Sequence, residues 1–220
     1  MTDAPLAGKS VSRETALTPP PAAAELLGSR VDALVPYAAL LARVGVERGL
    51  LGPREAPRLW DRHLLNCAAV ADALPAAGPV IDVGSGAGLP GVVWGLLRSD
   101  LEFVLVEPLL RRAAFLEEVI GTLGMTNVTV RRARAEQLHG VLAAPVVTAR
   151  AVARLEQLTA WCLPLLTPGG TLWALKGQSA AEELAHVIPT LPRAAARNSV
   201  IRTYGEGILT MPTTVVQITV

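Results

Sequence analysis

VIDVGSGAGLPG, residues 80–91, is the segment from which the fold of this 220-residue chain can be worked out. A run of β-branched residues leads directly into four glycines, at Gly84, Gly86, Gly88 and Gly91. Pro90 stands where the first turn of a helix is expected, a position that does not need the missing proline N–H. Glycines let the backbone turn sharply and approach a ligand, and the start of the helix offers unpaired N–H groups. The segment therefore predicts a strand, loop and helix that cradle a nucleotide-like ligand.

The chain around this segment alternates between β-branched runs and helical patterns. The β-branched runs lie at 80–83, 103–106, 128–130, 146–148, 171–175, 200–203 and 213–220. The helical patterns lie at 90–97, 109–123 and 155–166. Such alternation is typical of a parallel sheet covered by helices. The last two runs have no helix between them, so we expect an α/β domain whose mostly parallel seven-stranded sheet ends in an antiparallel hairpin.

Three parts of the chain differ in composition. Residues 1–21 are rich in Ser, Thr, Ala and Pro and lack apolar periodicity, which predicts a disordered leader. Residues 22–76 carry apolar side chains at intervals of three and four, which predicts a small N-terminal helical extension. Residues 77–220 hold the α/β pattern, and a chain of this length has room for one such core.

The composition excludes several classes of protein. Hydrophobic residues make up 51% of the chain and the mean hydropathy is +0.40, but charge, Gly or Pro interrupts the long apolar stretches, so we expect no membrane partner. The 20 basic and 19 acidic residues leave a net charge of +1, which gives no general basic field. Two cysteines and no secretory signal pattern predict a cytoplasmic protein without a disulfide or a metal site.

The glycine loop fits two kinds of ligand. Gly86, Gly88 and Gly91 have the spacing of a dinucleotide loop, which would suit an NAD-dependent oxidoreductase. Asp82 followed by Gly84, Gly86 and Gly88 has the form used for S-adenosylmethionine. A carboxylate aimed into the cradle would repel a pyrophosphate and attract the ammonium and sulfonium of S-adenosylmethionine. We therefore favour the methyl donor and keep the NAD enzyme as the alternative.

An acidic residue also ends the second β-branched run. Glu107 follows Gly84 by 23 residues, close to the spacing of one strand–helix–strand step. A carboxylate at that point can accept hydrogen bonds from both ribose hydroxyls of an adenosine. Because NAD and S-adenosylmethionine both contain adenosine, Glu107 supports a nucleoside ligand without choosing between them.

The methyl acceptor is constrained by the residues that the chain lacks. Neither Cys67 nor Cys162 follows a proline or lies on a glycine-rich loop, so the cysteine nucleophile needed to methylate pyrimidine C5 is not indicated. The fourth run ends at Arg150 without the Asn/Asp-Pro-Pro-aromatic segment that exocyclic amine methylation usually uses. An acceptor that is already nucleophilic, such as guanine N7, needs only alignment. Oxygen and small-molecule acceptors also remain open.

Six short motifs occur in an order that points to one family. They are RHLLN (62–66), DVGSGAGLPG (82–91), RRAAFLEE (111–118), RAE (134–136), ARA (149–151) and ALKG (174–177). Together they resemble the bacterial ribosomal small-subunit RNA methyltransferase G family, also called glucose-inhibited division protein B. The resemblance covers roughly residues 30 to 220 and leaves out the Pro-rich leader.

The resemblance implies a Rossmann-like class I methyltransferase that uses S-adenosylmethionine. It further implies methylation of N7 of one guanine in the decoding-region loop of 16S rRNA, within the small ribosomal subunit. The donor-site positions of the family fall on Gly84, Leu89, Ala135, Glu136 and Arg150. The family often has Asp where this chain has Glu107, which adds a methylene to the expected ribose contact.

The remaining candidates are basic. We expect Arg150, Lys176 and His63 in the catalytic site, and we expect the protein to act as a monomer. His63 also lies on the apolar face of its predicted helix, where packing is an equal alternative to a functional role. Arg111 and Arg112 begin a helix, where positive charge opposes the macrodipole and a phosphate contact would explain them. The predicted RNA contacts are Arg62, His63, Arg111, Arg112, Arg131, Arg132 and Lys176.

Overall fold

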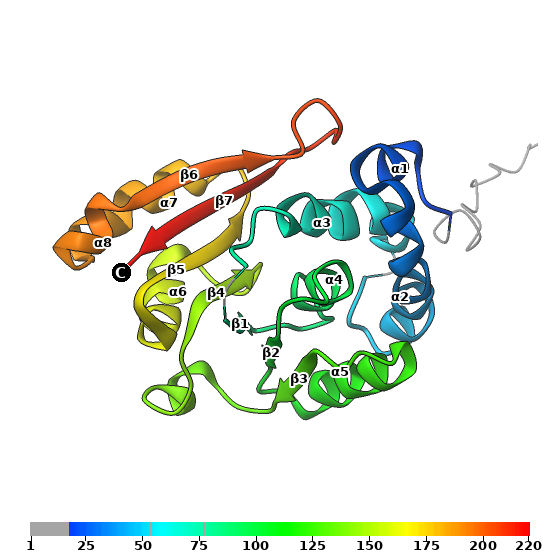
Figure 1. The fold of residues 1–220 in the computed structure, drawn as a ribbon, viewed down its shortest axis with the longest axis horizontal. Helices are drawn as coiled ribbons and strands as arrows, with labels where there is room; N and C mark the ends of the chain where they lie inside the picture. Colours follow the sequence, from blue (N-terminus) through cyan, green and yellow to red (C-terminus); the bar gives the residue numbers. More distant parts are fainter. Residues whose placement is uncertain (1–17, 53, 77) are drawn as a thin grey trace, which may run out of the picture.

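The computed structural model describes residues 18–52, 54–76 and 78–220. The predicted leader therefore lies mostly outside the described residues, and its last residue, Pro21, already begins the first helix. The order of elements along the chain follows the expected alternation (Figure 1).

Seven strands form a single sheet in the order β3-β2-β1-β4-β5-β7-β6. Strands β1 to β5 are parallel, and β7 lies antiparallel between β5 and β6. The strands are β1 (Val80–Val83), β2 (Phe103–Val106), β3 (Val128–Arg131), β4 (Ala144–Arg150), β5 (Leu166–Lys176), β6 (Ser199–Tyr204) and β7 (Thr213–Thr219). The predicted mostly parallel sheet and its closing hairpin are confirmed.

In the part of the chain that the structure describes, eight α-helices surround the sheet on both faces (Figure 1). They are α1 (Pro21–Leu27), α2 (Val35–Leu40), α3 (Leu65–Ala71), α4 (Gly91–Leu97), α5 (Leu110–Leu123), α6 (Leu155–Cys162), α7 (Ala180–Val187) and α8 (Arg193–Arg197). Shorter 3₁₀ or π turns are η1 (Gly28–Ala33), η2 (Leu41–Gly45), η3 (Ala56–Arg58), η4 (Leu59–Leu64), η5 (Ala135–Leu138), η6 (Leu163–Leu165) and η7 (Ile188–Thr190). Among the described residues, no helix has the length and hydropathy needed to cross a membrane.

The core has two layers, one on each face of the sheet. One layer packs the helical extension, α4 and α5 against the sheet, with Trp94 and Phe115 fully buried in it. The other packs α6, α7 and α8 against the opposite face. Central strands of a parallel sheet are covered on both sides, which is why every residue of β1 is buried.

The helical extension shares the core of the α/β domain. Trp94 on α4 donates its indole N–H to the Cys67 carbonyl on α3 at 2.8 Å. Tyr37 on α2 is buried and donates its hydroxyl to the Ala87 carbonyl, within the glycine loop, at 2.6 Å. Residues 22–76 therefore support the loop that follows β1 as well as covering one face of the sheet.

Candidate functional site

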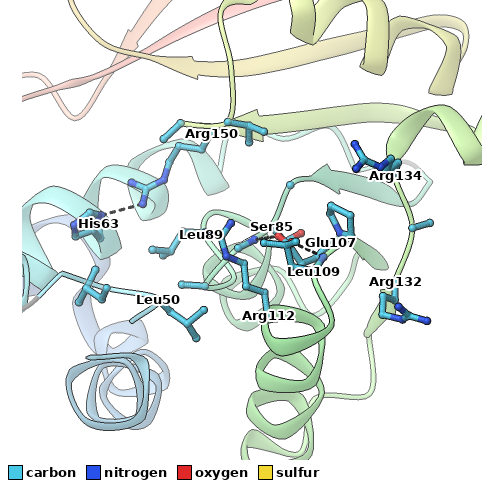
Figure 2. Close-up of a pocket in the computed structure, with 18 of the residues that line it drawn as sticks. Leu50, His63, Ser85, Leu89, Glu107, Leu109, Arg112, Arg132, Arg134 and Arg150 are labelled. Carbon is cyan, nitrogen blue, oxygen red and sulfur yellow. Dashed lines mark hydrogen bonds between the residues drawn. The ribbon is translucent and has the colours of Figure 1, made fainter. Parts of the chain in front are cut away.

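A cavity of about 860 Å³ opens at the carboxyl edge of the parallel strands (Figure 2). The glycine loop after β1, the ends of β2 and β4, the loop after β3 and the start of α5 all contribute to its lining. The extension adds Leu50, Leu51 and His63, which the strand pattern could not place at this edge. Parallel strands bring their carboxyl ends together at one edge, which is where α/β sheets bind ligands.

Two of the loop glycines shape the cavity and two allow packing. Gly84 and Gly86 line the cavity, and Gly84 has a φ of +71° with a would-be Cβ only 2.7 Å from the Val152 side chain. A side chain at Gly88 would collide with Val92, and the Gly88 backbone lies outside the lining. The predicted cofactor contact of Gly88 is therefore corrected to a packing role, which Gly91 shares.

Asp82 does not point into the cradle, so its predicted orientation is wrong. Its side chain is fully buried beneath the loop, and Oδ2 accepts the Gly91 N–H at 3.0 Å. Burial raises the pKa of Asp82 to about 7, although the hydrogen bond from Gly91 opposes this effect. The carboxyl group joins the end of β1 to the start of α4, and Asp82 is not one of the residues that line the cavity. Its charge therefore cannot choose between ligands by direct contact.

The loop itself provides a different argument about the ligand. Most of its backbone N–H groups already donate within the protein: Gly84 and Ser85 to the Val106 carbonyl, Gly86 to Glu107, Gly88 and Leu89 to the Ser85 carbonyl, and Gly91 to Asp82. A diphosphate that needs several of these donors would have to take them from the bonds within the protein. The loop therefore suits a ligand without phosphate groups, and the NAD alternative loses its structural support.

Glu107 lies at the end of β2, where the sequence predicted it, and faces the cavity (Figure 2). Its side chain is buried, and each carboxylate oxygen accepts one backbone N–H at 3.0 Å, from Gly86 and from Leu109. A carboxylate offers about four acceptor positions, so these two bonds orient the group and leave acceptors for the hydroxyls of a ribose. The added methylene relative to Asp is accommodated by these two bonds.

Arg150 extends from the end of β4 into the cavity and is held by the helical extension (Figure 2). Its Nη2 donates to His63 Nδ1 at 2.9 Å, and its Nη1 donates to the Arg62 carbonyl at 3.3 Å. His63 Nε2 lies 2.9 Å from Glu55 Oε2. Arg150 and His63 are both predicted from the sequence to lie in the site, whereas no motif points to Glu55.

A smaller cavity of about 100 Å³ adjoins the main one and shares Gly84, Pro108, Ala133, Arg134 and Val152 with it. Ala135 and Glu136 line this side pocket, as the family positions implied for a donor site. Apolar side chains from β1, β2 and α6 complete it, namely Val83, Val106 and Trp161. The lining of this side pocket is therefore mostly apolar.

The predicted basic residues divide into two groups. Arg112 and Arg132 line the main cavity, together with Arg134. Arg131, Arg62 and Arg111 lie outside the lining. Arg62 pairs with Glu55 at 3.2 Å, and Arg111 donates to the Arg48 carbonyl at 3.2 Å.

Lys176 is engaged inside the protein, which corrects its predicted catalytic and RNA-binding role. Its side chain is 9% exposed, and Nζ lies 2.7 Å from Glu183 Oε2 and donates to the Ala153 carbonyl at 2.9 Å. Burial raises the pKa of Glu183, but hydrogen bonds from Lys176, Ser179 and Leu155 outweigh it and lower the pKa to about 2. Lys176 therefore fastens β5 to α7 and does not face the cavity.

The side chains that could bind a metal ion do not cluster in the described residues. Among the described residues, no three His, Cys, Asp or Glu side chains gather in a way that could hold a metal ion. Cys67 and Cys162 are both buried, free thiols, and burial raises the pKa of Cys67 to about 11.

The chain is similar in sequence to proteins of one known family. A family model, GidB, described as rRNA small subunit methyltransferase G, matches residues 30–202. The ribosomal RNA small subunit methyltransferase G of Salinispora tropica is 52% identical over 212 residues, covering 91% of this chain and 88% of the relative. The protein of the same name from Thermobifida fusca is 52% identical over 204 residues, covering 93% and 86%.

The fold also matches solved methyltransferase structures. The crystal structure of precorrin-6y C5,15-methyltransferase from Geobacter metallireducens superposes with a TM-score of 0.50 at 13% identity, covering 78% of this chain and 90% of that chain. At this level of identity, the match concerns the fold, a Rossmann-like arrangement of sheet and helices.

Proposed function

Because the chain belongs to the rRNA small subunit methyltransferase G family, we propose that it transfers a methyl group from S-adenosylmethionine to N7 of a guanine in 16S rRNA. We place the target in the decoding-region loop of the small ribosomal subunit and the reaction in the cytoplasm. The observation that carries the proposal is the cavity at the strand ends, where Glu107 and Arg150 face one space from separate strands. We further propose that the protein acts as a monomer.

The residues of the cavity fit the parts of the donor. Glu107 would hold the ribose hydroxyls, and the side pocket with Ala135 and Glu136 would hold the adenine. Arg150 would pair with the carboxylate of the methionine portion, because a guanidinium presents paired donors to a carboxylate. Gly84 and Leu89 would form the wall between these ends. The donor, when bound, supplies an electrophilic methyl group on a sulfonium.

Methylation of guanine N7 requires the protein mainly to position the base. Guanine N7 has an in-plane lone pair and carries no proton, so the transfer needs no general base. Holding the base in line with the methyl group then supplies most of the rate. A guanine in a folded RNA reaches such a cavity by leaving its stack, as other base-modifying enzymes require.

The mouth of the cavity suits a polyanion. Arg112, Arg132 and Arg134 line it, and all three lie on the exposed side of the site (Figure 2). Lys and Arg contacts to phosphates make binding fall with salt concentration in proportion to the number of contacts. We expect Arg132→Ala with Arg134→Ala to flatten the salt dependence of kcat/KM. The matched control is Arg193→Ala with Arg197→Ala on α8, which lies outside the cavity lining.

The test of the proposed function uses methyl transfer to defined RNA. Small subunits from a bacterial strain that lacks its own enzyme of this family would be incubated with the protein and labelled S-adenosylmethionine, and the 16S rRNA would be mapped by mass spectrometry. We expect one new 7-methylguanosine in the decoding region. Transfer to another atom, or no transfer to either small subunits or free 16S rRNA, would overturn the proposal.

A further inference from the structure

Two side chains of the helical extension and one at the end of β4 form one connected row at the edge of the cavity. Glu55 lies just before η3, His63 lies on η4, and Arg150 ends β4. The imidazole stands between the other two, with Nε2 2.9 Å from Glu55 Oε2. Its Nδ1 lies 2.9 Å from Arg150 Nη2 (Figure 2). Arg150 and His63 line the cavity, whereas Glu55 stands behind them.

The chemistry of the three groups fixes where the imidazole proton lies. A guanidinium only donates hydrogen bonds, so His63 Nδ1 must carry a lone pair to accept from Arg150. A neutral imidazole then has its proton on Nε2, where it can be donated to a carboxylate. Glu55 supplies that acceptor. If the proton moved to Nδ1, two donors would face each other across 2.9 Å.

The surroundings keep His63 neutral. Burial lowers the pKa of His63, and the nearby guanidinium of Arg150 lowers it further, with a smaller contribution from Arg62. The Glu55 carboxylate acts in the opposite direction, through its hydrogen bond and its charge. The hydrogen bond with His63 is also the largest cause of the lowered pKa of Glu55, so the carboxylate stays ionised.

We propose that Glu55 is a positioning residue for donor binding: it selects the Nε2–H form of His63, which leaves Nδ1 free to hold the guanidinium of Arg150 at the cavity. This inference rests on the proposed function, because it takes the carboxylate of S-adenosylmethionine as the partner of Arg150. Glu55 also pairs with Arg62, whose side chain is 44% exposed. An exposed pair of this kind contributes little to stability, so it does not explain a carboxylate at this position.

The test follows the imidazole proton directly. The chain has three histidines, so a long-range proton–nitrogen NMR spectrum of protein labelled with ¹⁵N-histidine is simple, and His63→Asn identifies the signals of His63. We expect the wild-type signals to report Nε2–H with an unprotonated Nδ1. In Glu55→Ala, we expect a shift toward the Nδ1–H form. In Glu55→Gln, the amide oxygen can still accept the proton, and the wild-type form should persist.

Donor affinity completes the test. Calorimetry with S-adenosylhomocysteine should show about tenfold weaker binding in Glu55→Ala, the effect of about one charge-assisted hydrogen bond, and no more than about threefold weaker binding in Glu55→Gln. The control is Asp61→Ala, which removes an exposed carboxylate from η4, the short helix that carries His63, and should leave affinity unchanged. Urea unfolding checks that each variant is folded.

Three results would overturn the inference. One is a wild-type His63 protonated on Nδ1, which needs no variant to detect. The others are an unchanged imidazole form in Glu55→Ala, and an altered form without loss of donor affinity. A wild-type protein that fails to bind S-adenosylhomocysteine at all would instead refute the proposed donor site, while the NMR spectrum would still report on the role of Glu55.

Discussion

Replacing Asp82 by Asn tests whether this carboxyl group is a buried support of the loop. Its pKa rises from the ordinary 3.8 to about 7 because of burial. The folded protein therefore holds the proton more tightly than the unfolded chain, and the stability that this gives is present below pH 3.8 and lost as pH rises toward 7. Between pH 5 and pH 7, the loss is about 1.4 kcal/mol per pH unit, or about 3 kcal/mol in all.

Asparagine resembles the protonated acid and does not titrate, so Asp82→Asn should lack this loss. Its amide oxygen can accept the Gly91 N–H, while its NH₂ group occupies the place of Oδ1, which is buried without a partner. Burying this NH₂ group without a hydrogen-bond partner lowers the stability of the variant by about 1–3 kcal/mol, and this loss does not depend on pH. The free energy of unfolding of both proteins would be measured in urea at pH 5 and at pH 8. The difference between them, variant minus wild type, should be about 3 kcal/mol larger at pH 8 than at pH 5. Parallel behaviour of the two proteins with pH would refute the buried placement of Asp82.

Three further substitutions test the supports of the cavity. Gly84→Ala should weaken S-adenosylhomocysteine binding by about 1–3 kcal/mol in calorimetry, because the new Cβ strains a backbone φ of +71° and collides with the Val152 side chain. Adding Val152→Ala removes the collision but not the backbone strain, so it should restore only part of the lost affinity. Lys176→Met should lower the free energy of unfolding in urea by about 3 kcal/mol, because it leaves the Glu183 carboxylate without its cation, and adding Glu183→Gln should recover most of it. Tyr37→Phe should cost about 1 kcal/mol of stability and weaken donor binding, since it frees the glycine loop from α2. If a variant kept the affinity and stability of the wild-type protein, the role proposed for the replaced residue would be wrong.

The strands that the sequence predicted best are those whose signal is local. Val80–Val83 and Phe103–Val106 were predicted at their observed bounds, because short β-branched runs between turn residues are typical of buried parallel strands. Strand β5 begins at Leu166, five residues before its predicted start, because Leu166 pairs with Ala144 on β4. Long-range pairing of this kind leaves no local trace in a proline- and glycine-containing segment.

In the candidate site, too, some residues could be placed from the sequence and others depended on long-range contacts. The sequence placed Glu107 and Arg150 correctly at the strand ends, because the parallel alternation fixes which residues meet at that edge. The sequence does not show whether the Asp82 side chain points to the cavity or to the core, because a shift of one residue along a strand reverses the direction of its side chains. The predicted catalytic and RNA-binding role of Lys176 is wrong because its partner Glu183 lies on α7, which is not among the helices predicted from the sequence.

Calorimetric titration of the purified protein with S-adenosylhomocysteine and with NAD tests the identity of this cavity most directly. The structure predicts one molecule of S-adenosylhomocysteine bound per chain and no heat with NAD, because most N–H groups of the loop are already paired within the protein. Saturable binding of NAD with no binding of S-adenosylhomocysteine would contradict the assignment of the cavity to a methyl donor.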